Sequence, residues 1–192
     1  SREVIVNPDV KQAFTVPTNY GESEPSLSFY EMSVTKLDDN LYLAGQNWGF
    51  SVFYDAGDFF IGVGGYEQIT ERLAAVNNHL QTDKPLGYQI VTHHHLDHLG
   101  GMKEIYDLGA NFVAVAEHVS SIREIAGVDI PEDRFTLIDG KGELLDGKVK
   151  LVDFPNGHAS HNLLSYFPSA ELVFTADLFL SRHPSNAPPG YT

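Results

Sequence analysis

The sequence predicts a layered α/β or α+β domain in which helices cover mixed β-sheets. Short β-rich runs separated by glycines and acidic residues come first, and runs with strand and helix periodicity alternate after them. The chain has 192 residues, of which 42% are hydrophobic, so it can bury one sizeable core. No apolar run is long enough to cross a membrane. Disordered, coiled-coil and membrane-spanning classes are therefore excluded.

The first half of the chain is predicted to contain an irregular arm, four strands and a helix. Residues 1–26 hold three prolines and show no sustained period, which predicts the arm, and residues 27–192 are assigned to the domain. Runs rich in β-forming residues predict strands at Leu27–Thr35, Asn40–Gly45, Phe50–Tyr54 and Phe59–Val63. Apolar residues at helical spacing predict a helix over Tyr66–Leu80.

The second half alternates between strands and helices. Strands are expected at Tyr88–Thr92, Asn111–Ala116 and Phe135–Ile138, and helices at Met102–Leu108 and Glu117–Ala126. Asp146-Gly147 is a two-residue hairpin signal, which predicts paired strands at Glu143–Leu145 and Lys148–Phe154. A further pair is expected at Leu163–Phe167 and Glu171–Thr175. The chain then stops in loop-like sequence, so we expect a C-terminally truncated domain.

Charge and cysteine content limit the partners and the chemistry. The formal net charge is −14, which argues against nucleic acid and against an anionic membrane surface. The absence of cysteine excludes disulfides and thiolate metal ligands. A small-molecule substrate is expected, with no nucleic acid and no membrane partner. The oligomeric state and the compartment stay open: cytoplasmic, or periplasmic or secreted after removal of a leader.

The chemistry is concentrated in one histidine-rich run. Four of the nine histidines lie in the segment His93-His94-His95-Leu96-Asp97-His98, directly after an apolar strand and before Gly100-Gly101. A His-x-His-x-Asp-His match is expected only about 0.0014 times in a shuffled chain. If the chain stays extended, His93, His95 and Asp97 point to one side. Imidazole and carboxylate ligands suit zinc.

This run resembles the signature of the metallo-β-lactamase-fold metallohydrolases, whose fold is an αββα sandwich. Two later segments extend the resemblance, which runs from about residue 37 to 180: Gly157-His158 after a strand, and Phe174-Thr175-Ala176-Asp177 at the end of another. The resemblance implies that one metal is held by His93, His95 and His158. It implies that a second is held by Asp97 and His98, with Asp177 bridging the two.

The resemblance implies a zinc-dependent hydrolase with two Zn2+ ions per chain and a metal-bridging hydroxide as nucleophile. Asp97 is the candidate catalytic residue, orienting that hydroxide or taking its proton. The substrate class that we favour is a small ester, thioester or lactone. Two alternatives stay open: a mononuclear iron sulfur dioxygenase of the same fold, and a non-catalytic descendant with an incomplete site. Iron and manganese are therefore alternative metals, whereas a flavodiiron assignment is disfavoured because that branch has Glu at the position of His95.

Three departures from the family pattern stand out. Gly62 occupies the position where an aspartate usually supports the metal ligands from behind. The last histidine of the family pattern is missing, because the chain ends 15 residues after Asp177 and His183 lies too close to Asp177 to replace it. His161 stands three residues after His158, where relatives often have a small, acidic or proline-adjacent residue.

The other candidate residues have more ordinary interpretations beside their functional ones. Trp48, Phe50 and His161 are candidate substrate contacts, although the more ordinary expectation is that the two aromatic residues form a turn packed on its own sheet and that His161 is structural. His94 is expected to pack or face solvent, with a supporting role behind the ligands as the alternative. His79 and His118 are expected on helix surfaces.

Overall fold

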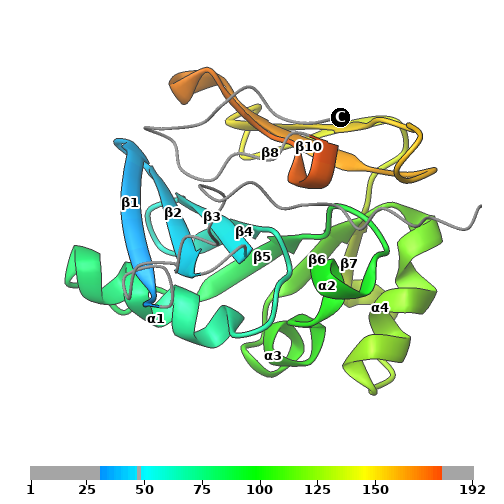
Figure 1. Ribbon diagram of the computed structural model, residues 1–192, viewed down its shortest axis with the longest axis horizontal. Helices are drawn as coiled ribbons and strands as arrows, with labels where there is room; N and C mark the ends of the chain where they lie inside the picture. Colours follow the sequence, from blue (N-terminus) through cyan, green and yellow to red (C-terminus); the bar gives the residue numbers. More distant parts are fainter. Residues whose placement is uncertain (1–30, 47–48, 179–192) are drawn as a thin grey trace, which may run out of the picture.

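The computed structural model describes residues 31–46 and 49–178, which form two β-sheets and a layer of helices (Figure 1). The larger sheet has seven strands in the order β1 to β7, and the smaller has the order β11-β10-β9-β8. The larger sheet consists of β1 (Ser33–Asp38), β2 (Leu41–Gln46), β3 (Gly49–Asp55), β4 (Phe60–Val63), β5 (Leu86–Ile90), β6 (Asn111–Ala114) and β7 (Phe135–Leu137). The smaller consists of β8 (Lys141–Leu144), β9 (Val149–Asp153), β10 (Leu163–Phe167) and β11 (Leu172–Phe174).

Strand direction changes within the larger sheet. Strands β1 to β4 pair antiparallel, through hairpins, whereas β4 to β7 pair parallel. The parallel strands need crossover connections, and helices supply them: α1 (Ile69–Leu80), α2 (Leu96–Leu99), α3 (Met102–Asp107) and α4 (Val119–Ala126). Loops after β5 and β6 therefore emerge at the same edge of the sheet, which is where the histidine-rich run lies.

Two hydrophobic clusters define the layers. In one, Ile69, Val76, Ile105 and Ile122 of the helices pack against one face of the larger sheet. In the other, residues of the opposite face, including Val52 and Ile90, pack against β9 and β10 of the smaller sheet. The described residues thus form a helix layer, a sheet and a second sheet, which are three layers of the expected αββα sandwich. None of their helices is long and apolar enough to span a membrane.

Several element bounds differ from the sequence prediction; strand β1, for example, runs to Asp38 and not to Thr35. Helix α1 begins at Ile69 and not at Tyr66, because Gln68 adopts a positive φ of 63°. The carboxylate of Glu104 then accepts hydrogen bonds from the backbone N–H groups of Gln68 and Thr70 and so caps the helix.

The predicted two-residue hairpin turn at Asp146-Gly147 is also wrong. Leu144 pairs with Val149, so the connection has four residues. Leu145 and Asp146 both adopt positive φ angles, as Gly147 does. Positive φ at a leucine is uncommon, so sequence rules do not anticipate this turn.

Candidate metal centre

The histidine-rich run leaves the sheet earlier than predicted and then turns into a helix. Strand β5 ends at Ile90, and α2 begins at Leu96. Asp97 therefore lies on a helix, whereas the sequence-based expectation was that it continues an extended segment. Asp97 nevertheless stays beside its neighbour His98, with 3.3 Å between Oδ2 and Nε2. In an extended strand, neighbouring side chains point to opposite faces. The helical turn instead allows the side chains of Asp97 and His98 to approach each other.

The first ligand set joins residues far apart in the sequence. Nε2 of His93 lies 3.2 Å from Nδ1 of His95 and 3.2 Å from Nε2 of His158. Asp177 Oδ2 lies 3.2 Å from Nε2 of His158 and 3.7 Å from Nε2 of His93. One ligand atom from each of these four residues lies within 4.8 Å of all the others. That spacing fits a single ion with three imidazole ligands and one carboxylate ligand.

The second ligand set shares Asp177 with the first. Asp177 Oδ1 lies 2.9 Å from Nε2 of His98, while Oδ2 faces the first set. Asp97, His98 and Asp177 form the second group whose ligand atoms lie within 4.8 Å of one another. The carboxylate of Asp177 therefore lies between the two sets, with one oxygen directed to each. The structure brings together all six residues predicted as metal ligands.

Burial favours neutral imidazoles in this cluster. Burial, and after it the nearby His98, His95 and His158, lower the pKa of His93 to about 2. The pKa of His95 is also lowered, by burial first and then by His158. A neutral imidazole keeps a lone pair for a metal ion. Among the described residues, Nδ1 of the buried His98 has no hydrogen-bond partner, and Nε2 faces Asp177 at 2.9 Å without forming a hydrogen bond.

Residues outside the motif hold the ligands in place. The ring of Tyr66 packs on that of His98, with 4.8 Å between the ring centroids, and burial raises the pKa of Tyr66. Oγ1 of Thr92 lies 3.2 Å from Nδ1 of His93. The side chain of Asn156 accepts a hydrogen bond from the backbone N–H of His158 and fixes that loop. Sequence reasoning missed Tyr66 and Asn156, because neither belongs to the motif.

Arg72 connects this region to the β2–β3 hairpin. It is 4% exposed and donates hydrogen bonds to the carbonyl oxygens of Glu67, Ala44 and Gly49. Its guanidinium lies 5.5 Å from the ring centroid of Tyr66. A buried arginine on helix α1 thus joins the hairpin to the aromatic ring that supports His98.

The other candidate residues fall into different settings. Phe50 lies on β3 and is half-buried, whereas Trp48 and His183 lie outside the described residues. His161 contacts Asp153, with Nδ1 2.7 Å from Oδ2, and is in neither ligand set.

The remaining histidines include one correction. His94 and His79 are exposed, as expected. His118 was expected on a helix surface, but it is only 2% exposed. It ends the short 3-10 helix η2 (Ala116–His118), which turns its side chain inward beside the β9–β10 loop.

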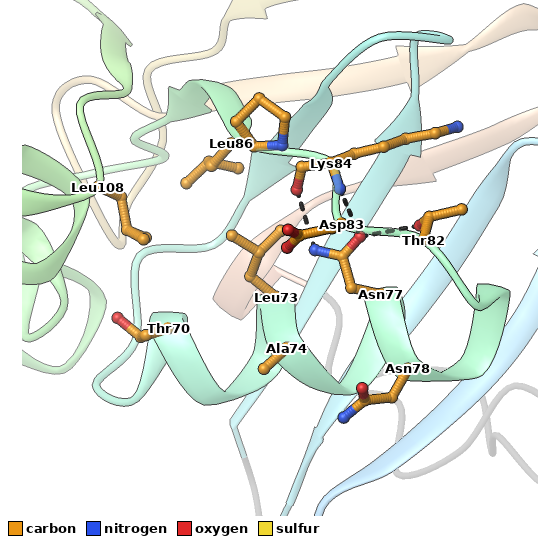
Figure 2. A pocket seen from close by; sticks show the side chains of 11 residues that line it. Thr70, Leu73, Ala74, Asn77, Asn78, Thr82, Asp83, Lys84, Leu86 and Leu108 are labelled. Carbon is orange, nitrogen blue, oxygen red and sulfur yellow. Dashed lines mark hydrogen bonds between the residues drawn. The ribbon is translucent and has the colours of Figure 1, made fainter.

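A pocket of about 370 Å³ lies at the opposite end of β5 (Figure 2). It is bordered by Leu73 and Asn77 of α1 and by Leu86, the first residue of β5. The side chain of Asn77 is engaged there with Thr82 and Lys84. Because the histidines follow the other end of β5, this pocket is separate from the ligand sets.

Comparisons with solved structures find the same fold. The metallo-β-lactamase FIM-1 from Pseudomonas aeruginosa, in its mono-zinc form, is 20% identical with a TM-score of 0.63, over 83% of this chain and 74% of that one. A metallo-β-lactamase from Hirschia baltica is 20% identical with a TM-score of 0.62, over 77% and 72% of the two chains. At this identity the likeness shows the fold alone.

Comparisons of sequence place the chain in a family. Diflavin flavoprotein A 1 of Synechocystis sp. is 32% identical over 104 residues, which are 53% of this chain but only 18% of that protein. The family model of the metallo-beta-lactamase superfamily matches residues 64–191. This match contains all six predicted ligands and well over half of the sequence. The chain therefore belongs to the metallo-β-lactamase superfamily.

Proposed function

We propose that this chain is a zinc-dependent hydrolase with two metal ions, acting on a small ester, thioester or lactone. The position of Asp177 carries the proposal. One carboxylate oxygen lies 2.9 Å from His98 and the other 3.2 Å from His158. A carboxylate that faces two ligand sets at once fits a pair of ions that share it.

The donor set fits zinc. Zinc takes imidazole nitrogen and carboxylate oxygen ligands, and both kinds occur in each set. The low pKa of His93 keeps its nitrogen free of a proton, and the unsatisfied nitrogens of His98 would gain a partner. When bound, the ions would lower the pKa of water and polarise a substrate carbonyl oxygen.

The protein side chains have separate roles in this proposal. His93, His95 and His158 would hold one ion and Asp97 and His98 the other, and Asp177 would be shared between the two sets. Asp97 is 70% exposed at its side chain, so it can also exchange a proton with solvent. Accepting the proton from the attacking water is the role of a general base.

Charge and apolar surface support a small substrate with an apolar part. The net charge of −14 disfavours polyanions such as nucleic acid. Leu96, between His95 and Asp97, is 72% exposed, and Phe154 is 49% exposed shortly before His158. Together with Trp48 and Phe50, these side chains are the proposed apolar contacts, with His161 as a polar one.

The test is hydrolysis by zinc-loaded protein of a panel of small esters, thioesters and lactones. Replacing Asp177 with Asn should remove turnover of any substrate that the parent cleaves and lower the zinc content. The matched control is Asp107→Asn, an exposed aspartate on α3 paired only with Lys103 among the described residues, which should keep full turnover. A parent protein that binds two zinc ions and cleaves nothing in the panel would refute the proposed substrate class.

Iron-dependent redox chemistry is the second candidate. Imidazole and carboxylate ligands also suit Fe(II), and the 32% match is to a protein named as a diflavin flavoprotein. His95 disfavours a flavodiiron branch, which has Glu at that position, whereas this match favours a flavin-linked relative. One iron per chain in the purified protein would redirect the substrate search to oxidation of thiols and persulfides.

A further inference from the structure

Three histidines that are in neither ligand set lie close together beside them. His94 follows β5, His118 ends η2 after β6, and His161 lies in the loop between β9 and β10. The ring centroid of His118 is 6.0 Å from that of His94 and 6.3 Å from that of His161. We call these three residues the outer histidines.

His118 is the buried member of this group. It is 2% exposed, and neither ring nitrogen makes a hydrogen bond with any described residue. A buried polar group without a hydrogen bond destabilises the fold, so the retention of a buried histidine here calls for an explanation. The pKa of His118 is lowered to about 4, by burial first and then by His94 and His161, while Asp153 and the backbone of His161 act in the opposite direction. At neutral pH the ring is uncharged and has a free lone pair.

His161 is oriented by a carboxylate. Its Nδ1 lies 2.7 Å from Oδ2 of Asp153, and the other oxygen of Asp153 accepts a hydrogen bond from the backbone N–H of Asn162. Asp153 therefore fixes the ring and leaves Nε2 available. Metal-binding histidines are commonly held in this way, with the second nitrogen bonded to a carboxylate.

An acidic residue completes the group. Glu117 precedes His118 in η2, and its Oε1 lies 3.8 Å from Nε2 of His161. Its side chain is 58% exposed, so it can move towards the rings. Three imidazoles with one carboxylate is a donor set that suits a divalent ion such as zinc.

We propose that the outer histidines, with Glu117, bind one further divalent transition-metal ion of the zinc class. Imidazoles that share a zinc ion at bonds of 2.0–2.1 Å have ring centroids about 5–6 Å apart. The His94–His118 separation of 6.0 Å is at the limit of that range, and the His118–His161 separation of 6.3 Å is slightly beyond it. A small shift of the partly exposed His161 ring towards His118, with rotation of the exposed His94 and Glu117, closes the site around the ion. Binding is weaker than at the two ligand sets, whose donor atoms are already within 4.8 Å.

Zinc titration of variants tests this site, with calorimetry for affinity and elemental analysis for stoichiometry. His161→Gln and His94→Gln should each bind one zinc ion fewer than the parent. Asp153→Asn should bind that ion 10–100-fold more weakly. His79→Gln removes an exposed histidine from the end of α1 and should match the parent.

A fourth variant separates this site from the proposed hydrolase centre. His95→Ala should lose the zinc ion of the first ligand set and keep the more weakly bound ion at the outer histidines. The outer site can therefore be measured even if the proposed hydrolase centre does not bind zinc. Circular dichroism checks that each variant is folded. Because His94 is exposed, His94→Gln should fold even if His161→Gln does not, so the site can still be tested with that variant. Equal stoichiometry and affinity in the parent, His161→Gln and His94→Gln would overturn the proposal.

Discussion

Gly62 on β4 lies so close to the side chain of Gln89 on β5 that a Cβ atom at position 62 would overlap Oε1 of the glutamine. The two residues are paired in the parallel register of the strands. Gln89 is fully buried, and its Oε1 has no hydrogen-bond partner among the described residues. The amide of Gln89 therefore takes up space next to the position where the family pattern expects an aspartate.

The first prediction concerns this pair. Gly62→Ala should destabilise the fold by about 1–3 kcal/mol, because the added methyl group overpacks the site. In a Gln89→Ala background the same substitution should cost much less, since the overlapping amide is gone. Urea unfolding of the two single variants and the double variant measures this coupling. Additive effects of the two substitutions would show that Gln89 does not restrict position 62.

Asp97 provides the second prediction, on activity. Asp97→Asn should keep the fold, since the side chain is 70% exposed, and should lower kcat by about 10²–10⁴-fold because the general base is lost. The substrate is the one identified in the panel, and thermal unfolding checks the fold. Full turnover by this variant would rule out a catalytic role for Asp97.

The third prediction is a pH dependence of stability in metal-free protein. The pKa of His118 falls to about 4 in the fold, against about 6.5 in the unfolded chain. Below pH 6.5 the unfolded chain takes up a proton that the fold does not, so stability is lost between pH 6.5 and 4. The loss is about 3 kcal/mol for this single group.

Comparison with His118→Gln isolates that contribution. The variant cannot titrate at this position, so its free energy of unfolding should change less between pH 6.5 and 4 than that of the parent. Chelator is included so that metal binding does not contribute. Parallel curves for the two proteins would mean that His118 has an ordinary pKa in the fold.

The fourth prediction concerns Arg72. Arg72→Lys should destabilise the fold by about 1–3 kcal/mol, because the single nitrogen of a compact ammonium group cannot reach the separate carbonyl oxygens that Nε and Nη1 of the planar guanidinium reach. It should also weaken zinc binding, since Arg72 contacts the Tyr66 ring that packs on His98. Lys103→Ala removes an exposed pair on α3 and should change stability by less than about 0.5 kcal/mol. Equal unfolding curves for Arg72→Lys and the parent would contradict this role.

Local patterns in the sequence were sufficient for most of the strands. The motif predicted His93, His95, Asp97 and His98 as ligands, and the family resemblance added His158 and Asp177; the structure brings these six side chains together. The β-rich runs also located β2, β3 and β4 to within two residues.

Features that depend on tertiary packing were not predictable in the same way. The burial of His118 depends on the β9–β10 loop, which is distant in the sequence. The close approach of Gln89 to Gly62 depends on the register of two parallel strands. An extended segment was predicted where the structure has the helical turn Leu96–Leu99. The prediction missed this turn because the histidine-rich run has no helical spacing of apolar residues.

Metal content per chain tests the central claim most directly. Elemental analysis is made on protein purified without added metal, before any zinc titration. Two tightly held zinc ions per chain are expected, since the carboxylate of Asp177 lies between two ligand sets, and Asp177→Asn should retain fewer. One iron per chain, or no metal and no uptake of added zinc, would contradict the dinuclear zinc centre.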